Sequence, residues 1–334
     1  MKKTNKTTMN DVAKLAGVGR GTVSNYINGY KVQEKNKQKI EKAIKELNYI
    51  PNLQARALKT AQNSTVVFIV PTSWTPFFSE MIFKMEKELN RYGYKMILAN
   101  SHLNPDEEKH ILEMATLNQV SGVITMSYSD VYNLQNFSKI SNLVAIERFI
   151  SDDIPLITSD NYAGGKLAAK KLLEKGSTRF LVLRHHDNHH NATDDRTKAF
   201  VDYLTAKQKP VDIFEAQSDD YRNEFYHYLS SHYAGHVVPF NGIFAVTDEY
   251  GMIAQEALSS IDPSLEHKVK LIGFDGSRIS PTTPRRIASI RQPIDEIVHE
   301  SVKILKQMND GVKVAKGFKK ILDVSYVEKE KLFK

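Results

Sequence analysis

Polar and aromatic side chains occur at, or shortly after, the ends of several apolar runs that we expect to form strands. These residues are Ser73, Trp74, Phe77, Phe78, Arg148, Asp160, Asn161, Arg196, Asp248 and Asp275. A carboxylate accepts hydrogen bonds from adjacent hydroxyls, a guanidinium donates a fixed fork, and an aromatic face covers C–H surface. We therefore predict that these residues bind a small ligand such as a sugar.

Each of these residue types also has an ordinary structural role, which competes with the binding role. Trp74 could fill a core, and of Phe77 and Phe78 we expect one to face the pocket and the other the core. Asp248 and Asp275 could cap the helices that follow them. The two arginines could form plain surface or interlobe ion pairs.

From residue 64 onward, short apolar runs alternate with amphipathic stretches, which is typical of parallel sheets with helices on both faces. The predicted strands are residues 66–70, 95–99, 122–126, 143–146, 180–183, 243–246 and 269–273. The predicted helices are residues 77–92, 107–118, 162–175 and 250–260. The pattern runs twice, so we expect two lobes, with residues 291–293 returning the chain to the first lobe and a helix there over 294–308. Such lobes bind a ligand between them, at the carboxyl ends of the strands.

Positive charge is concentrated at the N-terminal end of the chain. Residues 1–60 contain 13 Lys and Arg residues against 4 Asp and Glu residues, a net charge of +9, whereas the remainder carries −2 of the total +7. This asymmetry indicates a module that binds a polyanion, although charge alone is equally consistent with a solvated surface.

The spacing of residues in the basic segment predicts a helix-turn-helix. Thr8 and Asp11 are typical of a helix start, and Gly17 of a helix end, because glycine adopts the left-handed conformation without steric cost. A second short helix then carries Val23 on its apolar face, and a third extends over residues 34–47.

The second helix presents a polar face suited to the edges of DNA bases. Its residues there are Arg20, Gly21, Thr22, Ser24 and Asn25. Arginine reads guanine with two hydrogen bonds, asparagine reads adenine, and threonine offers a hydroxyl and a methyl group. The glycines of this segment could instead suggest a phosphate-binding loop, but no strand precedes them.

Three runs of this region, TMNDVAKLAGVGRGTVSNYING, KIEKAIKELNYIPN and ARALK, resemble the lactose/galactose repressor (LacI/GalR) family of bacterial transcription regulators. The resemblance implies that residues 52–60 form a hinge helix that orders on operator DNA. It also implies that Leu58 wedges between base pairs of the minor groove, where an apolar side chain kinks the duplex. The full set of DNA-contacting residues expected in this way is Thr8, Arg20, Gly21, Thr22, Ser24, Asn25, Asn28, Tyr49, Asn52, Ala55, Arg56, Leu58 and Lys59.

The larger part of the chain resembles the effector domain of the same family, which is similar to periplasmic sugar-binding proteins. The resemblance is carried by phrases such as PTSWTPFF, DNYAGGKLAAKKLLEKG, RTKAF, AVTDEYGMIAQEAL, IGFDG and IRQPIDEI. The fold class expected is therefore an all-α helix-turn-helix module followed by a two-lobed α/β domain. The expected parts are residues 1–51 for DNA binding, 52–62 for the hinge, 63–159 with 292–318 for the first lobe, and 160–291 with 319–334 for the second.

Metal, cofactor and covalent chemistry are not expected. The chain has no cysteine, which excludes disulfides and thiolate ligands. The histidine-rich run HHDNHHNATDDR (residues 185–196) could hold a metal, but its spacing matches no closed site, so we expect a solvated loop at the pocket rim. With neither a secretory signal nor a long apolar run, we expect a cytoplasmic, nucleoid-associated bacterial protein with no membrane contact.

Three classes of function have some support in the sequence: a repressor, a sugar-transport protein and an enzyme. We expect a repressor of carbohydrate-utilisation genes, most simply a homodimer that a sugar or sugar phosphate releases from a pseudo-palindromic operator. A sugar-transport protein would leave residues 1–60 unused. An enzyme would need a catalytic motif, and only Asp248 and Asp275 suggest an acid/base pair. A phosphocarrier protein as co-regulator, known in one branch of the family, is left open by the resemblance.

Overall fold

The structure is a computed structural model, and it describes residues 7–27, 30–49, 64–126, 142–187, 191–233 and 237–330. The chain divides into two compact units, residues 1–63 and 64–334. Within the described residues, no helix is both long and apolar enough to span a bilayer.

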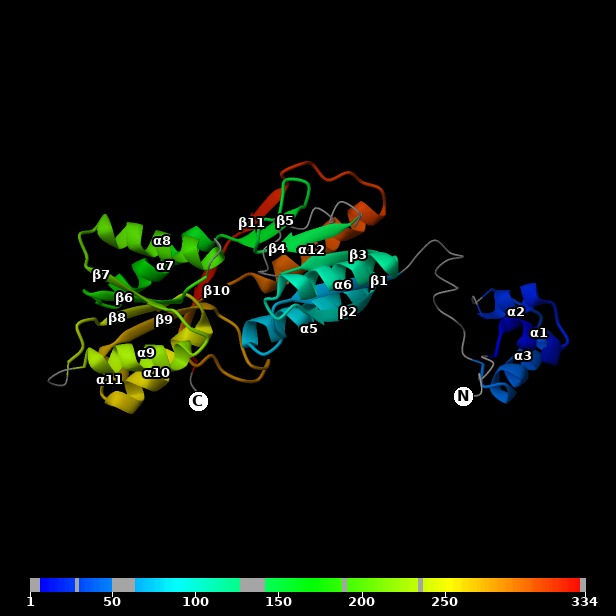
Figure 1. Cartoon of the computed structure of the whole chain (residues 1–334), viewed down its shortest axis with the longest axis horizontal. Coiled ribbons are helices and arrows are strands. Elements are labelled where there is room, and N and C mark those ends of the chain that lie inside the picture. Colours follow the sequence, from blue (N-terminus) through cyan, green and yellow to red (C-terminus); the bar gives the residue numbers. More distant parts are fainter. Residues whose placement is uncertain are drawn as a thin grey trace. The chain divides into compact units, whose positions relative to one another are not determined.

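The first unit contains the helices α1 (Met9–Ala16), α2 (Arg20–Ile27) and α3 (Glu34–Glu46) (Figure 1). The predicted start of α1 is confirmed: the Thr8 hydroxyl accepts from the Asp11 amide at 3.4 Å, and Asp11 Oδ2 accepts from the Thr8 amide at 2.8 Å. Gly17 ends the helix in the left-handed conformation, with φ of 65°. The helices pack around a small core of Val12, Ala13, Ala16, Val23, Ile40, Ala43 and Tyr49.

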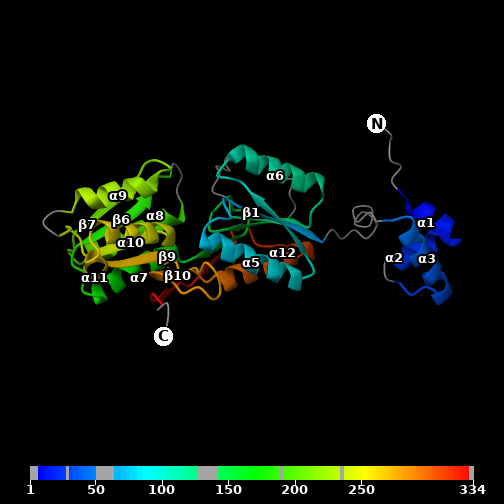
Figure 2. The same ribbon diagram turned by 90° about the horizontal axis from the view of Figure 1, so that it is seen from below.

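The sheet of the first lobe consists of six strands in the described residues, ordered β11-β5-β4-β3-β1-β2, and all neighbours are parallel. These strands are β1 (Thr65–Val70), β2 (Lys95–Asn100), β3 (Gly122–Thr125), β4 (Leu143–Ile146), β5 (Leu156–Ser159) and β11 (Lys319–Leu322). Helices α5 (Pro76–Arg91) and α12 (Ile294–Asn309) cover one face, and α6 (Pro105–Leu117) covers the other (Figure 2). Alternate residues of β1 serve the two faces: Phe68 packs towards the α5 side, and Val67 towards Leu112 of α6.

The second lobe repeats this plan with a sheet ordered β12-β10-β9-β8-β6-β7 in the described residues. Its strands are β6 (Phe180–His185), β7 (Val211–Ala216), β8 (Gly242–Ala245), β9 (Lys270–Asp275), β10 (Ala288–Arg291) and the antiparallel β12 (Ser325–Val327). Its helices are α7 (Asn161–Glu174), α8 (Ala192–Thr205), α9 (Tyr221–Ser231), α10 (Asp248–Ile261) and α11 (Leu265–Lys268). Figure 1 shows α7 and α8 on one side of this sheet and α9 and α10 on the other, as the two separate core clusters of the lobe require.

Every strand and helix predicted in the two-lobed domain is present, with ends within two residues of the prediction. One assignment is wrong: Lys319–Leu322, expected in the second lobe, forms β11 beside β5 of the first. Leu322 is buried in the core of the first lobe. This short strand consists of two lysines followed by two apolar residues, so its pattern alone does not indicate which sheet it joins.

Gly165 lies where α7 packs against α8, and a Cβ there would stand 2.1 Å from the Arg196 carbonyl oxygen. We expect Gly165→Ala to lower the free energy of unfolding by about 3 kcal/mol, because a backbone atom cannot move aside as a flexible side chain can. Urea denaturation followed by circular dichroism measures the change. Lys166→Ala, at an exposed position of the same helix, is the control and should change stability by no more than about 0.5 kcal/mol. Equal stability of the two variants would contradict this packing.

Candidate effector site and DNA-binding module

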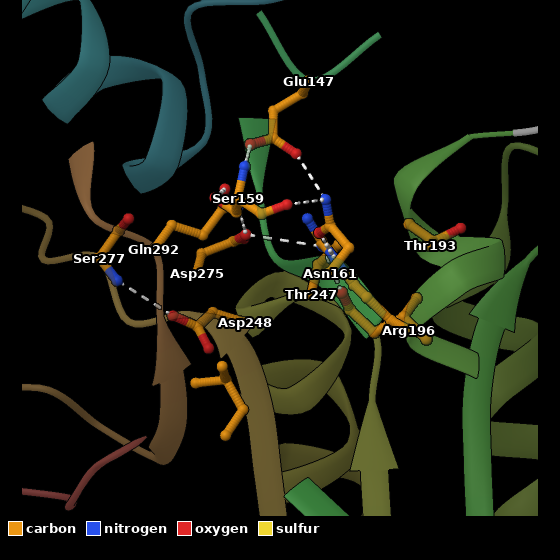
Figure 3. A network of polar contacts seen from close by, with 12 residues as sticks. Glu147, Ser159, Asn161, Thr193, Arg196, Thr247, Asp248, Asp275, Ser277 and Gln292 are labelled. Atoms are coloured by element: carbon orange, nitrogen blue, oxygen red, sulfur yellow. Dashed lines mark hydrogen bonds and ion pairs between the residues drawn. The ribbon is translucent and has the colours of Figure 1, made fainter. Parts of the chain in front are cut away.

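Arg196 lies at the centre of a buried polar network (Figure 3). Its side chain is 4% exposed, and Nε donates to Asn161 Oδ1 at 2.8 Å. Its Nη1 donates to the Val246 carbonyl at 2.8 Å and lies 3.8 Å from Asp275 Oδ1. The centre of the guanidinium lies 3.7 Å from the centroid of the Phe274 ring. These contacts fix the cation and bring together residues of α7, α8 and β9.

Gln292 joins this network to the first lobe. Its side chain is 1% exposed and follows β10 at the point where the chain leaves the second-lobe sheet. Gln292 Nε2 donates to Asp275 Oδ1 at 2.8 Å, and its Oε1 accepts from Ser159 Oγ at 2.8 Å, at the end of β5. A single side chain therefore connects the ends of strands from both sheets.

Glu147 is the first lobe's buried carboxylate in the network. It directly follows β4, is 7% exposed, and has a left-handed backbone with φ of 64°. Its carboxylate accepts from the Ser159 amide at 2.7 Å, from Asn161 Nδ2 at 2.8 Å and from Thr158 Oγ1 at 3.3 Å. Three donors converge on one carboxylate, so Glu147 also holds residues at the crossover between the lobes.

Asp248 and Asp275 stand at the carboxyl ends of β8 and β9. Asp248 accepts from Ser289 Oγ at 2.5 Å and from the Ser277 amide at 3.2 Å, so it supports the loop after β9. It does not cap α10, because Thr247 does so. Asp275 has a φ of 120°, a strained conformation of the kind that clusters at binding sites.

The two acids are both less acidic than usual. Burial raises the pKa of Asp248 well above its ordinary value, and the neighbouring Asp275 carboxylate raises it further. Burial also raises the pKa of Asp275, to about 6, although Arg196 and the hydrogen bond from Gln292 oppose the shift. The site thus contains two carboxyl groups that readily hold a proton.

The network brings together Asn161, Arg196, Asp248 and Asp275 of the residues proposed from sequence. The Asp160 carboxylate accepts from the Ala163 amide at 2.8 Å and caps α7, and its role in binding stays a prediction. Phe77 is 7% exposed and belongs to the first-lobe core, so it takes the core position that we expected for one of the two phenylalanines, and its role in binding stays a prediction.

The remaining candidates lie nearer the surface. Phe78 is half-buried, with its ring 5.2 Å from that of Phe77. Trp74 is 93% exposed, which excludes a core role within this unit. Ser73 accepts from Ser79 Oγ through its carbonyl at 2.8 Å, and Arg148 is half-buried directly after Glu147. No contact joins these residues to Arg196 within the described parts of the chain, so their role in binding stays a prediction.

Three residues of the network, Glu147, Ser159 and Gln292, are not among those predicted from the sequence. All three follow or end a strand, the same signal that identified Asp248 and Asp275. The rule would have found Glu147, which directly follows the predicted strand 143–146. It would not have found Ser159 and Gln292, because β5 and β10 are not among the predicted strands.

In the part of the histidine-rich segment that the structure describes, two histidines contact polar groups of the same lobe. His185 Nε2 lies 3.1 Å from the Ser218 carbonyl, and His186 Nδ1 lies 3.4 Å from Glu215. His189 and His190 lie outside the described residues. Within the described ranges, no three His, Asp or Glu side chains gather as metal ligands would.

In the helix-turn-helix module, the apolar and polar faces of α2 separate as predicted. Val23 is fully buried, Arg20, Gly21 and Asn25 are exposed, and Thr22 and Ser24 are half-buried. The Tyr26 hydroxyl donates to Glu41 at 2.7 Å and joins α2 to α3. The first turn of α2 carries no acidic residue that would repel phosphate.

Two residues that the resemblance implies as DNA contacts have partners within the module itself. Tyr49 is 8% exposed and belongs to the core of the module, so little of its side chain can reach DNA. The Thr8 hydroxyl is engaged with Asp11. The other expected contacts that lie outside the described residues are Asn28, Asn52, Ala55, Arg56, Leu58 and Lys59.

A helix-turn-helix module in one chain with a two-lobed α/β binding domain defines a DNA-binding regulator that responds to a small ligand. Residues 8–52 match the family described as bacterial regulatory proteins, lacI family. Residues 63–277 match the periplasmic binding proteins and sugar binding domain of LacI family. The sucrose operon repressor of Streptococcus mutans serotype c is 32% identical over 313 residues, which cover 93% of this chain and 95% of that protein. The chain belongs to the LacI family.

Solved structures share the fold. A periplasmic binding protein/LacI transcriptional regulator from Alkaliphilus metalliredigens, in complex with D-xylulofuranose, has a TM-score of 0.67 and 28% identity. The match covers 81% of this chain and 100% of the chain of that regulator. The lac repressor dimer bound to operator and the anti-inducer ONPF has a TM-score of 0.77 and 22% identity over 97% of this chain and 98% of that chain. At this identity the second match supports the fold alone.

Proposed function

We propose that this chain represses carbohydrate-utilisation genes and leaves its operator when a small sugar or sugar phosphate binds between the lobes. The observation that carries the proposal is the polar network of Arg196, Asp275 and Gln292, which links strand ends of both lobes. A ligand that exchanges hydrogen bonds with this network acts on both lobes at once. The sucrose operon repressor of Streptococcus mutans supports a sugar as the ligand class.

The proposed mechanism is an equilibrium that DNA and effector bias in opposite directions. Two helix-turn-helix modules of a homodimer read a pseudo-palindromic operator, and the effector favours an arrangement in which the hinge helices do not order. The coupling is reciprocal: operator DNA weakens effector binding by the same factor as effector weakens operator binding. Cytoplasmic, nucleoid-associated action fits such a regulator, and a phosphocarrier co-regulator would act through the same equilibrium.

We propose no catalytic activity. Asp248 accepts hydrogen bonds from Ser289 and Ser277, and Asp275 Oδ1 accepts one from Gln292, so both carboxylates serve to hold the site together. Incubation of the protein with each sugar of a panel should leave the sugar unchanged, and product formation would contradict the proposal.

The whole proposal is tested with full-length protein and a labelled duplex from upstream of its own gene. We expect binding that random competitor DNA does not displace at near-physiological salt. A thermal-shift panel of monosaccharides, disaccharides and sugar phosphates, with sucrose included, should identify the sugar that raises the melting temperature. That sugar should release the duplex. Absence of any preference for the duplex would overturn the proposed function.

Recognition by α2 gives a prediction with a matched control. Thr22→Ala should change the ranking of operator variants by about 1–3 kcal/mol at one base pair, because base contacts carry the sequence preference. Lys14→Gln should instead weaken all duplexes alike and reduce the salt dependence, because lysine attracts phosphate without reading bases. Fluorescence anisotropy over a set of single-base operator variants separates the two results. An unchanged ranking for Thr22→Ala would remove this residue from base recognition.

A further inference from the structure

Arg291 and Glu80 form an ion pair between parts of the chain that are 211 residues apart. Arg291 ends β10 of the second-lobe sheet, and Glu80 lies on α5 of the first lobe. Arg291 Nη1 donates to Glu80 Oε2 at 2.9 Å, and Nη2 donates to Glu80 Oε1 at 2.5 Å. Both side chains are 16% exposed. This two-bond fork is more strongly directed than a single contact.

The same guanidinium also contacts the turn that carries Asp275. Arg291 Nη1 lies 3.1 Å from the Gly276 carbonyl oxygen and 3.5 Å from the Asp275 carbonyl oxygen, and it donates to both. Gly276 has a φ of 60°, and a Cβ there would lie 2.7 Å from Arg291 Cα. The turn is therefore packed directly against Arg291, and only glycine fits at this close approach.

Lys84 extends the contact within the first lobe. It lies one turn after Glu80 on α5 and pairs with it at 2.9 Å. Lys84 also reaches Asp295 of α12 at 2.7 Å, although Asp295 is largely exposed. Burial alone raises the pKa of Glu80, but hydrogen bonds from Arg291 and Lys84 outweigh burial and lower that pKa to about 2. Glu80 is thus ionised at every physiological pH.

We propose that Arg291 is a positioning residue: it holds the strained turn at Asp275 and Gly276 and, through Glu80, ties that turn to α5 of the first lobe. A change at Asp275 is then passed to the first lobe by a rigid fork as well as by Gln292. The contact from the turn through Arg291 to Glu80, called the tie below, is a property of the fold and does not depend on regulation. Its part in regulation rests on the proposed function, so the two are tested separately.

The tie predicts a defined spacing between the lobes without any sugar or DNA. The chain contains no cysteine, so Lys109→Cys on α6 and Lys207→Cys beyond α8, both at exposed positions, place two spin labels on the full-length protein. Pulsed electron paramagnetic resonance then measures the distance between them, with excess unlabelled protein so that only pairs within one chain contribute. Glu80→Gln should make the distance distribution about twice as wide or shift its maximum, because the charged fork is lost.

The hold on the turn is measured by hydrogen exchange of the peptide that contains Gly276 and Ser277. Their amides donate to Ser289 Oγ and Asp248 Oδ2. We expect about tenfold faster exchange in Glu80→Gln, and an intermediate rate in Arg291→Lys, which keeps the charge but loses the fork. Arg222→Lys is the control, because the Arg222–Glu256 pair is exposed and lies within the second lobe.

The two measurements together decide the proposal. Faster exchange with a changed label distance, in Glu80→Gln but not in Arg222→Lys, supports it. Faster exchange with an unchanged distance overturns the tie to the first lobe, and an unchanged exchange rate overturns the hold on the turn. Neither readout requires operator binding or an effector, so failure of the proposed function would leave both results interpretable.

Discussion

Asp275→Asn is expected to abolish the release of operator DNA by effector while leaving operator affinity without effector within about twofold. The carboxylate of Asp275 is the charged acceptor that a ligand hydroxyl would meet beside Arg196. A hydrogen bond to a charged group contributes about 1.5–3 kcal/mol, so its loss should weaken effector binding by roughly tenfold to a hundredfold. Asparagine keeps the shape, can still accept from Gln292 Nε2, and tolerates the positive φ.

The measurement is a titration of the operator complex with the sugar that stabilises the wild-type protein. Asp219→Asn, at an exposed position of the same lobe, is the control and should respond like the wild type. Operator binding lost together with the effector response would indicate a folding role for Asp275. An effector response of normal strength would remove Asp275 from the site.

Asp275 and Asp248 could be proposed from sequence because each lies two residues after a run that is clearly a strand. The carboxyl ends of parallel strands share one edge of a sheet, so residues distant in sequence are brought together without knowledge of any contact. Asp160, proposed for its place at the crossover between the lobes, instead caps α7. A polar residue between a strand and a helix serves the helix terminus equally well, and only geometry separates the two roles.

Other features depend on contacts that no local pattern records. The pairing of Arg291 with Glu80 spans 211 residues and requires the docking of α5 against the end of β10. Which of two adjacent phenylalanines faces the core depends on the phase of α5, and Phe77 takes that position. The sheet of β11 is decided by its pairing with β5, because its own residues would fit the edge of either sheet.

Asp248→Asn is expected to stabilise the protein at pH 7.5 by about 1–3 kcal/mol, because it removes a carboxyl group that is costly to ionise where it is buried. The asparagine can still accept from the Ser277 amide, and its Nδ2 can donate to Ser289 Oγ in place of the present bond. Most substitutions of buried polar residues destabilise, so a gain in stability is a distinctive result. Circular dichroism in urea is the suitable probe, because the single tryptophan, Trp74, is 93% exposed and reports little on unfolding.

The pH dependence follows from the sign of the shifts. The folded-state pKa of Asp275, about 6, and that of Asp248 lie above the unfolded value of 3.8. Their contribution to stability is therefore fully present below pH 4 and is lost as the pH rises through the folded pKa values. A shift of about two units corresponds to roughly 3 kcal/mol, so stability should fall by about that amount between pH 4 and pH 7 through Asp275 alone.

The variants Asp248→Asn and Asp275→Asn show which carboxyl group causes each part of the pH dependence of stability. Asp248→Asn should keep the part that Asp275 contributes, whereas Asp275→Asn should remove that part and also lower the pKa of Asp248, because it removes the neighbouring negative charge. Carboxyl groups with lowered pKa values, such as Glu80, act in the opposite direction up to their unfolded pKa of 4.5, so above about pH 5 the change in stability reports the two raised acids. A stability that rises steadily from pH 4 to pH 7 in the wild type would contradict the burial of two acids at this site. A profile that neither variant alters would place the titrating groups elsewhere in the chain.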